Sequence, residues 1–521
     1  MDRTGTSGVH DVLVAHAERT PDAPIWVVVD RAGAARSITW ADFLDQVERC
    51  AVVWDGMGVA AGDAVVLHVG TSIEFLVAFF GLLRLGALAV PTNLASPAPE
   101  LAHVVRTTGA RHVLVEPAHD AVIDELERAD GMALATRVTT RAGAGTPARP
   151  DTVVLEDLVA AVAPGQRLDR PPPRGLAPAE VLFTSGTTSA PKGAVLSHRN
   201  LVRAGQRVAL HFEIGAGDRP MSVMPLFHTG GQCMGVMAAL VVGATGVLVE
   251  RYSASMFWST VRAQRATFVM LVPTHVRTLL AQPPDPDDGV HSLHSTGFGL
   301  RITDAERDTF ESRFGVRLTY CYGQTEACLN IAIAPLHGPR NWPALGPPAF
   351  DREVRLVDPV GTDVPAGDVG EIIVAATPGR DVMLGYANDP AATAATIRDG
   401  WLWTGDNGRF DEHGHLHFFD RRKDMIKRAG ENISALEVES ILAAHPDVLE
   451  AAVIGVPDHI REEAVKAFVV ARPGSRLDEA AITAHCAGHL ASFKVPTEVE
   501  FRDELPHTSI GKINKGALRH A

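Results

Sequence analysis

The sequence predicts an α/β fold with two bodies, a large one formed by residues 1–420 and a small C-terminal one formed by residues 421–521. From about residue 9 to residue 250, amphipathic helical stretches alternate with apolar runs of four to six residues. This alternation is typical of buried parallel strands joined by helical crossovers. After about residue 343 short strands with turn signals take over, and the last hundred residues return to an α/β pattern.

Individual elements follow in order along the chain. We expect helices at VHDVLVAHAERT and ADFLDQVERCAVVWDGMG, and strands at AVVLHV, ALAVP and HVLVE. Residues 141–177 are rich in Pro, Gly and Ala and predict a connection. A β-rich subdomain is expected at about residues 343–420, with a hairpin turn at DEHGH. The small domain should contain helices at SALEVESILAAH and EAAITAHCAGHL and strands at EAAVIGVPD and KAFVVA.

Composition excludes several classes of protein. A chain of 521 residues suggests two to four domains, and 46% apolar residues suffice for large cores. A net charge of −14 argues against nucleic acid as a partner. The five cysteines form no CxxC pair, which suits a reducing compartment. The N-terminus has no signal-peptide pattern and the longest apolar stretches are too short for a membrane span, so we expect a cytoplasmic protein.

The strongest local motif is VLFTSGTTSAPKG, residues 181–193. An apolar strand leads into small hydroxyl residues and glycine, whose N–H and O–H groups can converge on an anion, and a lysine adds a positive charge for phosphates. The pattern differs from the GxxxxGK[ST] loop, so no Walker-type NTPase is implied. A flexible linker is the alternative interpretation. The candidate phosphate-binding residues are Thr184, Ser185, Gly186, Thr187, Thr188 and Lys192.

This loop resembles the phosphate-binding loop of the adenylate-forming superfamily, which includes acyl-CoA synthetases, luciferases and peptide-synthetase adenylation domains. Five further motifs follow in the family's order, so the resemblance covers nearly the whole chain. They are MPLFHTGG, YCYGQTEA, GWLWTGDNGRF, DRRKDMIKRAGENISALEVE and GKINK. Several segments are most similar to the crotonobetaine/carnitine-CoA ligase branch. The resemblance implies stacked α/β sheets in the large domain and a mobile small domain.

The resemblance assigns nucleotide contacts to the motif at residues 322–326. It implies that Tyr322 flanks adenine, that Gly323 forms the turn of this cofactor-binding motif, that Thr325 touches the α-phosphate and that Glu326 holds Mg²⁺. A carboxylate suits a hard cation that neutralises a pyrophosphate leaving group. Without the other motifs, a strand followed by a polar turn would be the simpler interpretation.

Three more nucleotide contacts are implied by position in the family pattern. Gly297, Phe298 and Gly299 take the place of the adenine-lining segment, where the Phe298 side chain would narrow the nucleotide edge. Asp406 resembles the aspartate that accepts hydrogen bonds from both ribose hydroxyls, a role that suits an ionised carboxylate. Arg421 matches the family arginine beside the ribose and phosphate. A solvated turn and a solvated basic face are the alternatives.

The acyl pocket is expected behind MPLFHTGG. His228 resembles the gate at the mouth of that pocket, although a histidine after an apolar run is also typical of a core position. The neighbouring residues are small or apolar and are expected to form the pocket wall. They are Thr229, Gly230, Gly231, Cys233 and Met234, together with Met270 and Thr274.

The small domain is expected to supply the second set of catalytic groups. Lys512 matches the late catalytic lysine, whose ammonium would hold the substrate carboxylate and the α-phosphate together. Lys423 matches the hinge on which the small domain turns, and Gly430 matches the loop that lines the pantetheine tunnel. RRKDMIKR is a conceivable nucleic-acid patch, but the acidic residues around it argue against that.

The motif series predicts an AMP-forming carboxylic acid–CoA ligase that uses ATP, Mg²⁺ and CoA in two steps. The wall HTGGQCMG offers neither aromatic cage nor carboxylate for a carnitine-like cation, so we expect a bulky apolar acid. Alternatives are carnitine or crotonobetaine as substrate, release of the acyl-adenylate, or transfer to a pantetheinyl carrier in trans. A nucleotide-binding regulator without turnover is a further alternative. We expect a monomer or homodimer.

Overall fold

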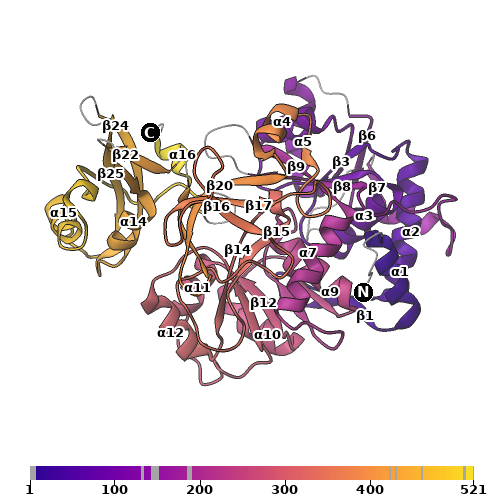
Figure 1. Ribbon diagram of the computed structural model, residues 1–521. Coiled ribbons are helices and arrows are strands. Elements are labelled where there is room, and N and C mark those ends of the chain that lie inside the picture. Colours follow the sequence, from indigo (N-terminus) through magenta and orange to yellow (C-terminus); the bar gives the residue numbers. More distant parts are fainter. Residues whose placement is uncertain are drawn as a thin grey trace.

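The computed structural model describes residues 7–130, 134–141, 152–184, 191–421, 424–428, 431–458, 462–507 and 512–519. Figure 1 shows a large body, coloured indigo to orange, and a small yellow body beside it that contains the C-terminus. The chain leaves the last sheet of the large body at Arg421 and enters the sheet of the small body at Met425. No helix in the described part of the chain has the length and apolarity that crossing a bilayer demands.

The first sheet of the large body has eight strands. Its interior strands are parallel, and an antiparallel strand closes each edge. This arrangement confirms the α/β architecture that the alternating pattern predicts. The strands in spatial order are β15 (Leu329–Ile333), β14 (Leu318–Gln324), β13 (Ser295–Phe298), β12 (Phe268–Leu271), β10 (Pro220–Ser222), β11 (Gly246–Val249), β1 (Pro24–Val29) and β2 (Ala35–Thr39).

The second sheet also has eight strands, and its parallel strands end at the same edge. Ligands of parallel α/β sheets bind at that carboxyl edge, and the strand that leads into VLFTSGTTSAPKG is one of these strands. The order is β18 (Gly385–Tyr386), β9 (Lys192–Ser197), β8 (Pro178–Thr184), β4 (Leu88–Pro91), β3 (Ala64–His68), β5 (His112–Val115), β6 (Thr136–Thr139) and β7 (Val153–Val154).

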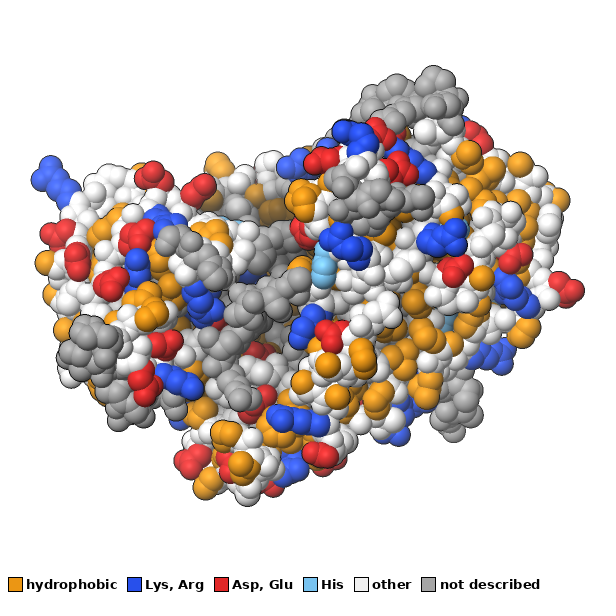
Figure 2. Space-filling model, turned by 90° about the horizontal axis from the view of Figure 1, so that it is seen from above, with side chains coloured by type: hydrophobic (Ala, Val, Ile, Leu, Met, Phe, Trp, Pro, Cys, Tyr) orange, Lys and Arg blue, Asp and Glu red, His pale blue; other side chains and the backbone are white. Residues whose placement is uncertain are grey.

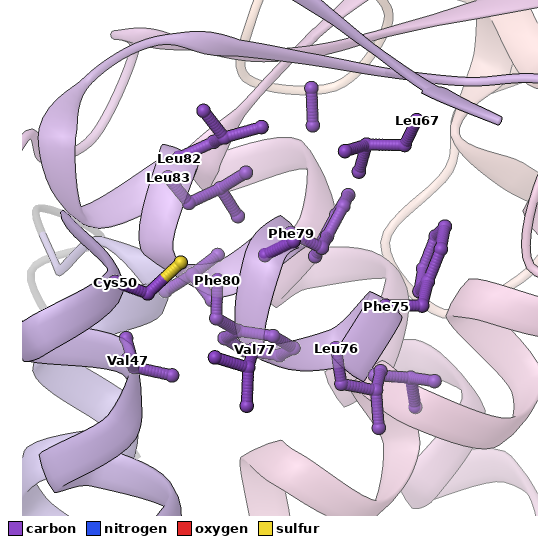
Figure 3. Packing of buried hydrophobic residues seen from close by; sticks show 14 of the residues in the cluster. Val47, Cys50, Leu67, Phe75, Leu76, Val77, Phe79, Phe80, Leu82 and Leu83 are labelled. Atoms are coloured by element: carbon purple, nitrogen blue, oxygen red, sulfur yellow. The ribbon is translucent and has the colours of Figure 1, made fainter. Parts of the chain in front are cut away.

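One hydrophobic core joins both sheets through helices α1 (Val9–Arg19), α2 (Trp40–Gly56), α3 (Ile73–Leu85) and α7 (His198–His211). Helix α3 is buried at every position except Glu74, as expected for a helix covered on all sides. Figure 3 shows Phe80 of α3 beside Val47 and Cys50 of α2, with Phe79 and Phe75 farther along α3. A Cβ at Gly81 would lie 2.9 Å from the Cys50 sulfur, so the glycine permits the close approach of these helices.

The expected connection at residues 141–177 is wrong in part. Within it lie strand β7 and helix α6 (Leu155–Ala161), whose Leu155 and Val159 pack into the core beside α2. These two buried residues, four positions apart, anchor one face of the helix. The Pro, Gly and Ala residues around it favour the prediction of a connection instead.

The remaining helices of the large body cover the two sheets or connect their strands. The longer ones are α4 (Ala98–Thr108), α5 (Asp120–Asp130), α10 (Ala254–Gln264), α11 (Pro273–Leu280) and α12 (Asp304–Phe314). The short ones are η1 (Pro117–His119), α8 (Thr229–Gly231), the π-helical η2 (Gln232–Met237), α9 (Ala238–Val242) and η3 (Thr325–Ala327).

A third, antiparallel sheet forms the β-rich part of the large body. Asp411 caps its predicted hairpin turn, since its Oδ1 accepts hydrogen bonds from the backbone N–H groups of His413 and His415, both at 2.9 Å. The sheet contains β16 (Val354–Val357), β17 (Gly370–Ala375), β20 (Trp401–Phe410), β19 (Ile397–Arg398) and β21 (Leu416–Arg421), with helix α13 (Pro390–Thr396). Strand β18, between β17 and β20 in sequence, leaves this sheet and pairs with β9.

The small body is a five-stranded sheet packed against helices, as predicted for the final hundred residues. Its core includes Val438, Leu442, Val465 and Ile482. The strands are β22 (Met425–Arg428), β23 (Glu431–Ser434), β24 (Val448–Asp458), β25 (Glu462–Ala471) and β26 (Glu498–Phe501). The helices are α14 (Ala435–Ala443), α15 (Glu479–Ala487), η4 (Ser492–Lys494) and α16 (Lys515–Arg519).

Candidate active site

The two ends of the predicted phosphate loop lie at the carboxyl edge of the second sheet. Thr184 closes β8 and Lys192 opens β9, and the two residues pair across the hairpin. The Thr184 hydroxyl donates a hydrogen bond to the Lys192 carbonyl oxygen at 3.4 Å. Ser185, Gly186, Thr187 and Thr188 lie outside the described residues.

Tyr386 connects Lys192 to Glu326 of the YGQTE motif. The sequence motifs did not identify Tyr386 as a site residue. The Lys192 ammonium lies over the Tyr386 ring, 5.1 Å from its centroid. The Tyr386 hydroxyl donates a hydrogen bond to Glu326 Oε1 at 2.8 Å. Burial and the adjacent Glu326 carboxylate raise the pKa of Tyr386 well above its usual range, so the phenol remains a donor. Its only sequence signal is that the chain contains just four tyrosines.

The motif at residues 322–326 runs from the end of β14 into the short helix η3. The Tyr322 hydroxyl donates a hydrogen bond to Asp406 Oδ2 at 2.8 Å, and both side chains are largely buried. A Cβ at Gly323 would lie 1.7 Å from the Leu329 carbonyl oxygen, so only glycine fits there. Asp406 thus lies beside the end of β14, where the sequence places an adenine-flanking aromatic ring.

Thr325 and Thr229 bring two distant motifs together. Their hydroxyl oxygens lie 3.1 Å apart and share a hydrogen bond. The contact joins YGQTE to MPLFHTGG across 96 positions of sequence. Since Glu326 follows Thr325 and His228 precedes Thr229, the candidate metal ligand and the candidate gate lie on either side of this hydrogen bond.

The segment at residues 297–299 places its glycines and its phenylalanine on opposite faces. A Cβ at Gly297 would lie 2.8 Å from both Met234 Cε and Met270 Sδ, and one at Gly299 would lie 2.9 Å from Met270 Cε. The expected wall methionines therefore lie together against these glycines.

Phe298 faces the other way, because successive side chains of a strand point to opposite faces. Its ring is fully buried and packs in the core beside Tyr320 and Trp342. The expectation that this side chain narrows the nucleotide edge is therefore wrong.

His228 lies half-buried directly before helix α8, as its N-cap residue. Its Nδ1 accepts a hydrogen bond from the backbone N–H of Gly230 at 3.0 Å. Burial and the nearby positive charge of Lys512 lower the pKa of His228 to about 4, so the imidazole is neutral at physiological pH. The small body thus brings Lys512 close to the large body at His228. From above, the surface is hollowed between the two bodies (Figure 2).

A buried acid lies beside the residues expected to form the pocket wall. Glu180 of β8 is fully buried, and burial raises its pKa to about 8. Its carboxyl group neighbours Gln232 and Cys233, and Cys233 is itself completely buried. At neutral pH this acid is mainly protonated and supplies no negative charge to the wall.

Several other predicted residues are placed as follows. Thr229, Gly230 and Gly231 are buried in helix α8, as the wall requires, whereas Thr274 is exposed in the first turn of α11. Arg421 ends β21, but its side chain lies outside the described part of the chain. Lys423 and Gly430 lie entirely outside it.

Glu326 is suited to a magnesium ion that also binds a polyphosphate. Among the described residues no group of three or more His, Cys, Asp or Glu side chains forms a metal site. Mg²⁺ usually binds through one or two carboxylates and completes its octahedron with phosphate oxygens and water. A single carboxylate close to a phosphate-type loop therefore fits Mg²⁺ better than a metal that needs a full protein cage.

Together these contacts form one path between the two bodies. Lys192, Tyr386 and Glu326 make its first part, and it continues through the Thr325–Thr229 hydrogen bond to His228 and Lys512. Two ammonium groups and one carboxylate along such a path can bind a nucleoside triphosphate and a second anion at once.

Two family models match the chain. The model of the AMP-binding enzyme family matches residues 13–387, and the model of the AMP-binding enzyme C-terminal domain matches residues 437–512. The second match includes Lys512.

Relatives match along the whole chain. A crotonobetaine/carnitine–CoA ligase of Citrobacter koseri is 38% identical over 520 residues and covers 100% of both chains. One from Escherichia fergusonii is 37% identical over 492 residues, 94% of each chain. The structure of an anthranilate CoA ligase in complex with anthranoyl-AMP superposes with a TM-score of 0.88 at 27% identity, covering 100% and 98% of the chains. A benzoate CoA ligase of Burkholderia xenovorans gives 0.85 at 25% identity, covering 98% and 99%.

Proposed function

Because the chain belongs to the AMP-binding enzyme family and is an ATP-dependent, AMP-forming acid–CoA ligase, we propose that the path from Lys192 to Lys512 is its adenylation site. In this reaction a carboxylate oxygen attacks the α-phosphorus of ATP, the bond to the β-phosphate bridging oxygen breaks, and pyrophosphate leaves. The observations that carry the proposal are the Lys192–Tyr386–Glu326 contacts and the positive charge of Lys512, which acts on His228 across the two bodies.

On the nucleotide side, each residue has a role that its contacts support. Asp406, already an acceptor for the Tyr322 hydroxyl, accepts hydrogen bonds from the ribose hydroxyls. Lys192 binds the outer phosphates, and Thr325 donates to the α-phosphate. Glu326 holds Mg²⁺, oriented by the Tyr386 hydroxyl. When bound, the ion offsets the charge on the pyrophosphate leaving group.

Lys512 acts on the other side of the reacting atoms. Its ammonium holds the substrate carboxylate and the α-phosphate together and stabilises the charge that develops between them. His228 stays neutral throughout the physiological range, since its pKa is about 4. It therefore acts as a neutral gate at the acyl pocket and leaves the positive charge to Lys512.

For the second step, we propose that the small body turns about Lys423, withdraws Lys512 and presents the loop around Gly430. The thiol of CoA then attacks the acyl carbon and AMP leaves. Two half-reactions at one carbonyl need different groups, which a rotating domain supplies in turn. Within the described residues, the last sheet of the large body ends at Arg421 and the sheet of the small body begins at Met425, which supports a hinge between these two strands.

The acid that we propose as substrate is bulky and apolar. The wall formed by Gly297, Met234 and Met270 supports this, because thioether side chains adapt their shape to aromatic and cyclic groups. Carnitine carries a quaternary ammonium, which requires an aromatic cage or a carboxylate. Glu180, the buried acid beside Gln232 and Cys233, is mainly protonated at neutral pH. This favours a neutral acyl group, even though relatives are named for crotonobetaine and carnitine.

The deciding experiment is pyrophosphate exchange over a panel of aromatic, cyclic, branched and linear acids, with carnitine and crotonobetaine included. We expect exchange with the apolar acids. Exchange with carnitine and none with apolar acids would contradict the proposed substrate class. Mass spectrometry of the products with CoA present tests the second step. Adenylate without thioester would instead support release of the acyl-adenylate, or transfer to a carrier protein in trans.

We further propose a cytoplasmic enzyme that acts as a monomer or homodimer. The free and buried state of all five cysteines supports a reducing compartment. Cell fractionation and light scattering on the purified protein test these two points.

A further inference from the structure

A buried ion pair lies three residues beyond Lys512. The Lys515 ammonium lies 2.7 Å from Glu439 Oε1, and both side chains are largely shielded from solvent. Glu439 Oε1 also accepts a hydrogen bond from the backbone N–H of Val453 at 2.7 Å. Burial alone would lower the pKa of Lys515, but Glu439, Asp424 and Asp420 together raise it, so the ammonium stays charged.

The ion pair fixes the segment that follows Lys512. Ile513 packs against the small body's second core and bridges to His507, and the Asn514 backbone N–H donates to the Pro506 carbonyl oxygen at 2.7 Å. Lys515 then begins helix α16, whose Leu518 is buried in the same core. Apolar packing alone would allow this segment to shift slightly along the small body. The buried Lys515–Glu439 ion pair forms in one position of the segment and therefore selects that position.

A second ion pair joins this segment to the connection between the bodies. An Arg519 guanidinium nitrogen at the end of α16 lies 2.7 Å from Asp424 Oδ1. Asp424 lies next to the proposed hinge residue. Asp420, just before the hinge, accepts hydrogen bonds from the Ser434 hydroxyl at 2.9 Å and from the Leu436 N–H at 3.2 Å, at the start of the helix that carries Glu439.

We propose that Lys515 and Glu439 are positioning residues for adenylation, which hold the tail in the register that brings the Lys512 ammonium to the acyl pocket. The inference rests on the proposed role of Lys512. The pair acts through Lys512, so it serves the first half-reaction and has no part in thioester formation.

The test is Lys515→Met, which keeps the length of the side chain and removes its charge. A misplacement of about 1 Å in a catalytic group costs up to about 100-fold in rate. We expect the kcat of pyrophosphate exchange to fall by about 10- to 100-fold, with the KM for ATP and thioester formation from supplied acyl-adenylate nearly unchanged. Lys515→Arg should restore most of the exchange.

Lys466→Met is the matched control, because Lys466 forms an ion pair with Glu500 at 2.9 Å on the surface of the same body. Surface pairs contribute little, so both half-reactions should stay at the wild-type level. If Lys515→Met fails to fold, Glu439→Gln removes the same pair with an isosteric side chain and is expected to give the same split between half-reactions.

Two outcomes would overturn the inference. One is an equal loss in both half-reactions, which indicates a merely structural pair. The other is wild-type exchange in a folded Lys515→Met. Lys512→Ala separates this inference from the proposed function: exchange lost in Lys512→Ala but intact in Lys515→Met contradicts the positioning role alone. Exchange intact in Lys512→Ala contradicts the proposed adenylation site itself.

Discussion

Tyr386 contacts both Lys192 at the end of the phosphate loop and Glu326 of the YGQTE motif. Its ring lies under the Lys192 ammonium, and its hydroxyl donates to Glu326. Sequence reasoning could not find it, because it reaches the site through the pairing of β18 with β9, about which neither segment carries a signal. Glu326, Lys192 and Asp406 could be predicted because each lies in a motif with its own residue pattern.

Tyr386→Phe keeps the ring and removes only the hydroxyl. A hydrogen bond to a charged group contributes about 1.5–3 kcal/mol, so we expect at least about a ten-fold fall in kcat/KM for MgATP in pyrophosphate exchange. Tyr252→Phe is the control, because its hydroxyl bonds to Thr278 Oγ1 at 2.6 Å, away from the path described above. Equal activity of the two variants would contradict the orienting role of Tyr386.

Gly297→Ala tests the methionine wall. The added methyl group would lie 2.8 Å from Met234 Cε and Met270 Sδ, so these side chains must shift into the acyl pocket. One methylene in such a pocket is worth about 1–3 kcal/mol. We therefore expect kcat/KM to fall for the largest accepted acid and to change little for the smallest. Gly289→Ala, where a Cβ would meet nothing within 4 Å, should leave both unchanged.

At the scale of elements, strand β8 carries both the phosphate loop and a buried acid. The folded state raises the pKa of Glu180 from 4.5 to about 8. Between these values the folded protein binds a proton that the unfolded chain releases. The contribution of Glu180 to stability is therefore complete below pH 4.5 and is lost as the pH rises toward 8.

Glu180→Gln removes this dependence while keeping the shape of the side chain. We expect the free energy of unfolding of the variant relative to wild type to rise between pH 5 and pH 8, by about 3–5 kcal/mol in total. Denaturant unfolding of both proteins at each pH measures the difference. If the difference in free energy of unfolding between variant and wild type is the same at pH 5 and pH 8, Glu180 does not titrate in this range.

The elements also show how far sequence patterns reach. Periodicity found the alternating helices and parallel strands because each element buries one regular face. Position in the family pattern did not predict the orientation of Phe298, since a motif match gives a position along the strand but not the face on which the side chain lies. Periodicity failed at α6, where only Leu155 and Val159 anchor a short helix in a stretch rich in helix breakers.

At the scale of the whole molecule, the proposed mechanism makes catalysis depend on the position of the small body. The proximity of Lys512 to His228 corresponds to the arrangement that we propose for adenylation. Which acid enters, and how the bodies rearrange afterwards, depend on contacts between segments far apart in sequence, and no local pattern encodes them.

Lys512→Ala should separate the two half-reactions. Without the ammonium we expect adenylation to fall by about 100-fold or more, while thioester formation from supplied acyl-adenylate and CoA stays near the wild-type rate. Rapid-quench measurement of each half-reaction checks this, with Lys466→Ala as the lysine control. A similar loss in both halves would contradict the proposal that Lys512 serves only the first.

The crossing of β18 from the antiparallel sheet to the edge of β9 has a consequence for dissecting this enzyme. A fragment that stops before residue 343 would lose both the cover of that edge and the phenol beside Lys192. An uncovered sheet edge invites aggregation, so such a fragment should neither stay monodisperse nor bind ATP. Chimeras between relatives should instead be joined directly after Arg421, because the described strands of the two bodies belong to separate sheets and do not pair with each other.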